Sequence, residues 1–129
     1  MTSSELLSLG RRYRANLPDD FINLLPEVRG AFARGESPAM RLKARKPDAN
    51  RTIREAILKE LQIYLCTDDP RYRGLRGKGK KLSEAAVGVI AGFVASAVGI
   101  AAGFAIAAVA YLAAFVLDIG ASVFCRIMA

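Results

Sequence analysis

The chain has 129 residues, of which 53% are hydrophobic, a net charge of +7 and no histidine. This length allows one domain, with or without one appendage. The missing histidine excludes Ser-His-Asp and Cys-His catalysis and histidine metal sites, so we expect neither an enzyme nor a cofactor. The charge is unevenly divided, because residues 1–83 carry a net +8 and residues 84–129 a net −1. The composition therefore indicates a basic polar head joined to an apolar tail.

Residues 1–66 are expected to form a helical head of about three helices. Ser3 or Ser4 is a suitable N-cap for a helix over 3–15, and a second helix over about 19–34 contains Pro26, where it either starts or kinks. Residues 35–50 read as a linker. A third helix over 51–66 has the clearest helical spacing, with apolar residues four apart at Ile53, Ile57, Leu61 and Leu65.

Two cysteines, Cys66 and Cys125, stand 59 positions apart in a chain that shows no secretory leader. Such a pair does not make a disulfide framework, so we expect two reduced, mostly buried thiols. The head is then expected to stay in the compartment where it is made.

Residues 67–83 form a basic loop ahead of the tail. Its cations are Arg71, Arg73, Arg76, Lys78, Lys80 and Lys81. Lys and Arg next to an apolar segment bind anionic lipid and keep that end cytoplasmic. The stretch GLRGKGKK imitates a phosphate-binding loop, but Lys81 stands where a Ser or Thr would bind magnesium and no strand precedes it, so we reject that interpretation.

Residues 84–129 are an apolar segment whose only charged members are Glu84, Asp118 and Arg126. One helix from 85 to 129 would be roughly 66 Å long, about twice the thickness of a bilayer core. We therefore predict a helical hairpin, either transmembrane or fully buried. The turn is expected within 99–103, with a second possible break at 118–120.

Small residues recur every three or four positions along this tail. They are Gly88, Gly92, Ser96, Gly99, Gly103 and Ala107. On one continuous helix they share a face, as in a glycine zipper, and such faces let helices pack closely in lipid. We predict a helix-packing face, with either the other half of the hairpin or a second chain as its partner.

Asp118 is a carboxylate near the end of an apolar run, with Ser122 one turn and Arg126 two turns further on. Charged groups inside a membrane usually face a partner or a water-filled path. The three residues therefore either line a polar path or interface, or lie at the head-group level beyond the end of the span.

The stretch LCTDDPRYRGLRGKGKKLSEAAVGVIAGFVAS, followed by DIGASVFCRIM, resembles small bacterial proteins that join a cytoplasmic helical head to a Gly/Ala-rich membrane segment. This resemblance begins at Leu65, covers about half of the chain and includes effectors and accessory subunits of toxin and phage-defence systems. The apolar hairpin also resembles the buried hairpin of pore-forming colicins, although three short head helices are expected to be too few to cover it.

These observations predict an all-α protein that associates with the inner membrane, its head in the cytoplasm. We expect a membrane-active, pore-forming or permeabilising effector that binds anionic lipid and self-assembles or packs with a protein partner. One alternative is a non-toxic anchor or interaction subunit. Another is a soluble all-α oligomer or a basic nucleic-acid-associated protein with a buried hairpin, although no nucleic-acid-binding module is recognisable.

Overall fold

The computed structural model describes residues 1–37, 49–72, 75 and 82–129, and every regular element within these ranges is a helix. The predicted all-α class is therefore confirmed. Buried residues from both sides of position 84 belong to one hydrophobic core. The predicted linker lies largely outside the described residues, as do all the predicted basic residues of 71–81 except Arg71.

Helix α1 is Ser3–Arg12, and its N-cap is Thr2 rather than Ser3 or Ser4. The Thr2 hydroxyl accepts a hydrogen bond from the Glu5 amide, and the Glu5 carboxylate accepts one from the Thr2 amide. This reciprocal capping satisfies amides that have no partner within the helix. Leu6 and Leu9 enter the core, and the short helix η1, Arg14–Asn16, follows.

Two helices occupy the region in which we expected one. Helix α2 is Asp19–Ile22 and helix α3 is Leu25–Ala33. Pro26 lies in the first turn of α3, where its missing amide hydrogen costs nothing. The proline therefore starts a helix rather than kinking one.

Helix α5, Ala49–Cys66, buries the face predicted from its spacing, including Ile53, Ile57, Leu61 and Leu65. The short helix η2, Pro70–Tyr72, comes after it.

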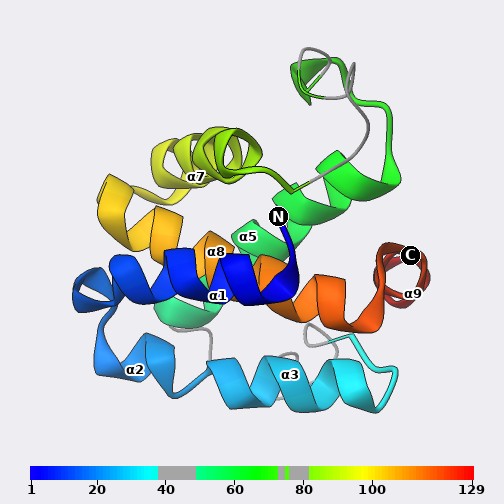
Figure 1. Cartoon of the computed structure of the whole chain (residues 1–129), viewed down its shortest axis with the longest axis horizontal. Helices are drawn as coiled ribbons and strands as arrows, with labels where there is room; N and C mark the ends of the chain where they lie inside the picture. The colour runs from blue at the N-terminus through cyan, green and yellow to red at the C-terminus, as the bar shows by residue number, and fades with distance from the viewer. Residues whose placement is uncertain (38–48, 73–74, 76–81) are drawn as a thin grey trace.

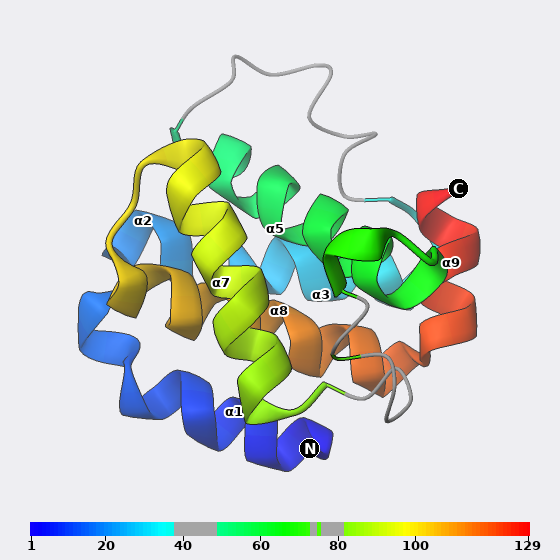
Figure 2. The ribbon, with the colours of Figure 1, turned by 90° about the horizontal axis from the view of Figure 1, so that it is seen from above.

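The apolar tail forms three helices. Helix α7, Glu84–Val98, is capped by the Ser83 hydroxyl and ends at Gly99, whose φ of 71° favours glycine. Helix α8, Ala102–Ile119, follows, and helix α9, Ala121–Met128, begins after Gly120. The breaks between these helices, at 99–101 and at Gly120, fall within the ranges predicted from the sequence, 99–103 and 118–120. In Figure 2, α7 crosses α8 steeply, so the pair does not form the tight antiparallel hairpin that we expected.

Helix α8 lies at the centre of the molecule. Figure 1 shows it between α1 in front, α7 above and α3 below, and α5 also contacts it. Val109, Leu112 and Val116 are completely buried, and burial of each such side chain contributes about 1.5–3 kcal/mol. The short head helices, which we expected to be too few, therefore do cover α8.

A disulfide joins Cys66 at the end of α5 to Cys125 in α9. This corrects the expectation of two reduced thiols. The two cysteines are distant in sequence, but α9 folds back against α5 and brings their Cα atoms to 5.6 Å.

Gly10 of α1 allows a close approach to α8. A Cβ atom at this position would lie 2.9 Å from Tyr111 Cε2, whereas a Cβ at Gly92 of α7 would meet nothing within 4 Å. We predict that Gly10→Val lowers the free energy of unfolding by about 1–3 kcal/mol through overpacking. Gly92→Ala should raise it by about 0.5–1 kcal/mol, because glycine inside a helix is unfavourable.

Urea denaturation followed by circular dichroism, with the disulfide intact, measures both changes. Equal effects of the two substitutions would contradict the packing described here, and a loss of stability in Gly92→Ala would mean that its face is occupied.

Candidate membrane-active helix pair

Helices α7 and α8, residues 84–119, are here called the apolar helix pair. No residue from 85 to 117 is charged. Helix α8 has 18 residues with a mean hydropathy of 2.1, so its rise of about 27 Å is close to the thickness of a bilayer core. By length and composition, this one helix among the described residues could cross a membrane.

The burial of α8 is instead typical of a core helix. Within this fold 56% of its residues are buried, and the core helix of a water-soluble protein has the same composition. Length and hydropathy therefore do not separate a membrane span from a core helix.

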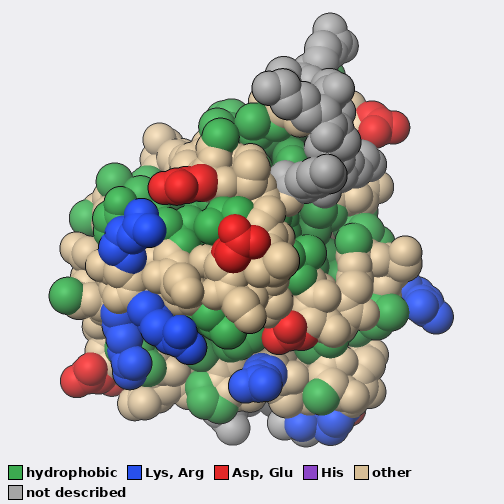
Figure 3. Space-filling model, in the orientation of Figure 1, with side chains coloured by type: hydrophobic (Ala, Val, Ile, Leu, Met, Phe, Trp, Pro, Cys, Tyr) green, Lys and Arg blue, Asp and Glu red, His purple; other side chains and the backbone are tan. Residues whose placement is uncertain are grey.

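Helix α7 differs from α8 because one of its faces is open. The outer face of α7 consists of Gly88, Val89, Gly92, Phe93 and Ser96, all of them exposed. Val89 and Phe93, at 39% and 40%, are the exposed large hydrophobic side chains of the described chain. Figure 3 shows hydrophobic side chains on the upper left surface, where α7 lies. An uncharged helix face is thus available to a second apolar surface.

The six small residues of the predicted packing face do not stay together. Gly88, Gly92 and Ser96 lie on the outer face of α7, and Gly99 forms the turn. In α8, Ala107 is buried and a Cβ at Gly103 would lie 2.7 Å from Asn16 Cγ. The turn at Gly99 breaks the continuous helix on which the prediction depended, so these residues serve different contacts.

A polar and aromatic cluster fixes α7 against α5. The Tyr72 hydroxyl donates to Glu60 Oε1 over 2.6 Å, and Arg71 Nη1 lies 3.0 Å from the same carboxylate. The Tyr72 ring meets Phe93 of α7 edge to face, with centroids 5.5 Å apart. Phe93 is therefore held at the edge of the outer face by Tyr72 and Arg71 of η2, which Glu60 joins to α5.

Arg71, predicted to bind lipid, already has protein partners. Besides Glu60, it contacts Asp69 Oδ1 at 3.3 Å, and its guanidinium lies 5.6 Å from the centre of the Phe93 ring. Of the six predicted lipid-binding cations, this is the one within the described residues, and here it orders the contact between η2 and α7.

Burial of Tyr72, which is 1% exposed, raises the pKa of its hydroxyl above the usual value. The hydrogen bond to Glu60 and the negative charge of Glu60 raise this pKa further. Folding therefore favours the protonated form of the Tyr72 hydroxyl.

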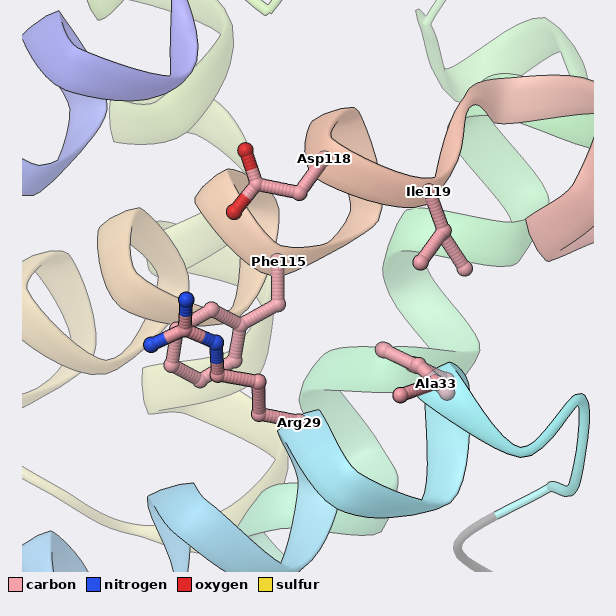
Figure 4. A pocket seen from close by; sticks show the side chains of 6 residues that line it. Arg29, Ala33, Phe115, Asp118 and Ile119 are labelled. Atoms are coloured by element: carbon pink, nitrogen blue, oxygen red, sulfur yellow. The ribbon is translucent and has the colours of Figure 1, made fainter.

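Asp118 lies at an open pocket between α3 and α8. The pocket has a volume of about 320 Å³ and is lined by Arg29, Phe32, Ala33, Phe115, Asp118 and Ile119. Figure 4 shows the Arg29 guanidinium beside the Phe115 ring, 6.0 Å from its centre, with the Asp118 carboxylate above them. Asp118 is exposed and forms no ion pair with the described residues.

Ser122 and Arg126 lie beyond Gly120, where α8 ends, and both are exposed on α9. They therefore do not continue one helix face from Asp118. In this fold the three residues border a surface rather than a buried path.

Within the described residues, no group of three or more His, Cys, Asp or Glu side chains is placed to hold a metal ion. Comparison of the chain with protein-family models, with curated proteins and with solved structures gave no match. A function for this protein is therefore argued from its own residues.

Sequence reasoning missed the Tyr72 cluster and the contact between Gly10 and Tyr111. The first joins residues from three elements, and nothing in the sequence pairs Glu60 with Tyr72. The second left a weak signal, because a glycine inside an amphipathic helix often marks a close approach.

We predict that Tyr72→Phe lowers the free energy of unfolding by about 2 kcal/mol, the usual worth of a buried hydrogen bond to a carboxylate. Folding raises the pKa of Tyr72 above its value in the unfolded chain, which is about 10. The stability that the protonated hydroxyl provides is therefore complete below pH 10 and is lost as the pH rises above 10. The difference between wild type and variant should therefore shrink above pH 10.

Urea denaturation at pH 7, 9.5 and 11 measures this difference. Tyr13→Phe is the matched control, because the Tyr13 hydroxyl forms no hydrogen bond within the described chain. An equal loss in both variants would contradict the role of the Glu60 contact.

Asp118→Asn should change the free energy of unfolding by less than about 0.5 kcal/mol, because an exposed carboxylate without an ion pair contributes little. Phe115→Ala, three residues earlier on the same pocket wall, should lower it by about 3 kcal/mol. Thermal or urea unfolding compares the two variants. A large loss in Asp118→Asn would show that the carboxylate has a structural partner.

Proposed function

We propose that the protein is a membrane-active effector that carries the apolar helix pair in a water-compatible fold and transfers it to an anionic bilayer. The observation that carries this proposal is the uncharged run from 85 to 117, combined with the uncharged outer face of α7. The surface helices of soluble domains usually carry charged and polar residues on their exposed face, and the outer face of α7 carries only Ser96.

The proposed transfer has a physical order. The outer face of α7 meets the bilayer first, because Val89 and Phe93 are already accessible. Helix α8 follows by exchanging its contacts with α1, α3 and α5 for lipid, which is as apolar as the core that it leaves. The net charge of +7 draws the protein toward anionic lipid.

A second candidate function is a non-toxic interaction module that uses the same exposed face. The complete burial of Val109, Leu112 and Val116 in α8 favours it, because a helix already covered by its own chain does not need lipid. In that case α7 docks on a partner protein and α8 stays in the core. The two functions differ in whether ions or dyes cross a bilayer.

The experiment uses full-length protein and vesicles loaded with a fluorescent dye, made of phosphatidylglycerol and phosphatidylcholine or of phosphatidylcholine alone. We predict dye release from the anionic vesicles and much less from the neutral ones. Val89→Glu should reduce the release at least tenfold, because a charge within a membrane-inserted helix costs about 2–3 kcal/mol. In water the same change is tolerated, since Val89 is exposed and faces solvent.

Ser8→Glu is the matched control, because it adds the same charge at an exposed position of α1, outside the apolar helix pair. Its release should differ from wild type only by the effect of one unit of net charge. No release by wild-type protein under any lipid composition, with or without dithiothreitol, would overturn the effector proposal and leave the interaction module. Equal release by Val89→Glu and Ser8→Glu would exclude α7 as the inserting helix.

A further inference from the structure

The Cys66–Cys125 disulfide encloses the apolar helix pair. Cys66 is the last residue of α5, Cys125 lies in the middle of α9, and the loop closed between them contains all of α7 and α8. The disulfide therefore links the helix that follows the pair, α9, to the end of α5. In Figure 2, α9 packs at the side of the molecule, beside the end of α5.

We propose that this disulfide is a redox gate. When it is oxidised, it keeps α8 packed against α1, α3 and α5, and when it is reduced, it allows α8 to leave them. This inference rests on the proposed function, because it concerns the release of the same helix pair.

The reach of the tether supports a gate. With residues 120–124 fully extended, Ile119 stays within about 20 Å of Cys125, which is bonded to the end of α5. Helix α8 itself rises about 27 Å over its 18 residues. With the bond intact, the C-terminal end of α8 therefore stays within about 20 Å of the end of α5, and α9 remains beside its docking place and rebinds.

Besides the disulfide, α9 is held by the packing of Ile127 and Met128 on the core and by a small number of side-chain contacts, one of which joins the Ser37 hydroxyl to Met128 Sδ at 3.9 Å. The Phe124 ring packs edge to face on Phe32 at 5.9 Å, and Gln62 Nε2 donates to the Met128 carbonyl over 3.1 Å. Phe124 is the one buried residue of this eight-residue helix. A helix this short is marginal by itself in water, so breaking the covalent link should leave α9 free to open locally.

Gly120 provides the hinge for such an opening. Its φ of 92° and ψ of 143° separate the axes of α8 and α9, and side-chain-bearing residues rarely adopt this conformation. Helix α9 can thus swing away without first unwinding α8.

Both cysteines are partly exposed, which makes the bond accessible to a reductant. A thiolate of a dithiol attacks one of the two sulfurs, the Cys66–Cys125 bond breaks, and a mixed disulfide forms. The second thiol of the dithiol, as its thiolate, then displaces the remaining cysteine. The dithiol loses two electrons and becomes a cyclic disulfide, while Cys66 and Cys125 each take up a proton.

The test measures amide hydrogen exchange and vesicle leakage on the full-length chain, with and without dithiothreitol. Without membranes, reduction should accelerate exchange of the α9 amides and of the last turn of α8 at least tenfold, and by clearly more than in the middle of α5. With anionic vesicles, reduced protein should release dye at least fivefold faster than oxidised protein. The double variant Cys66→Ser with Cys125→Ser should show the amide exchange and dye release of reduced protein, and dithiothreitol should change neither.

The two measurements separate the gate from the function. Unchanged amide exchange in α9 would overturn the gate. A uniform acceleration of exchange along the chain would also overturn it, because the disulfide would then stabilise the whole fold rather than α9. If both redox forms do release dye, equal rates of release would also overturn the gate. Local opening of α9 without leakage in either form would uphold the gate as a property of the fold and overturn the effector function. If the double variant does not fold, the dithiothreitol comparison on the natural chain still decides.

Discussion

The structure depends on covering a helix that has no polar face. Helix α8 is uncharged until Asp118, and an α-helix that is apolar all around must be surrounded by protein or lipid. The head supplies this cover through α1, α3 and α5, each of which offers one apolar face. Gly10 lets α1 approach Tyr111 closely, and the Ser3 hydroxyl adds a hydrogen bond to the Ala114 carbonyl. Head and tail consequently share one core, although their compositions differ so much.

Helix α7 shows where this cover ends. Its inner face, with Ala86, Ile90 and Val94, closes the core over α8, whereas its outer face is exposed. Glycine and serine keep the apolar area of that face small, and the Phe93 ring is partly covered by Tyr72 and Arg71. The same helix is thus stable in water and ready to meet an apolar surface, which is what both candidate functions require.

The far end of the core is closed covalently. Helix α9 is too short to hold itself in place, and the bond from Cys125 to Cys66 keeps Phe124 against Phe32. Under the proposed effector function, the contacts that cover α8 have to be strong in water and weak at the membrane. A disulfide fits this proposal, because reduction removes the covalent link between α9 and α5.

Much of the helical layout could be predicted from the sequence alone. The spacing of Ile53, Ile57, Leu61 and Leu65 determined a helix and its buried face, Gly99 marked a turn, and the uncharged run predicted helices compatible with lipid. These features are local, because a helix depends on residues within a few turns of each other. Only the tertiary structure decided that α8 is covered by the head, that Asp118 is exposed beside Arg29, that Tyr72 bonds to Glu60 and that Cys66 meets Cys125. Each of these joins residues far apart in the chain, and no local pattern specifies which apolar face will cover which.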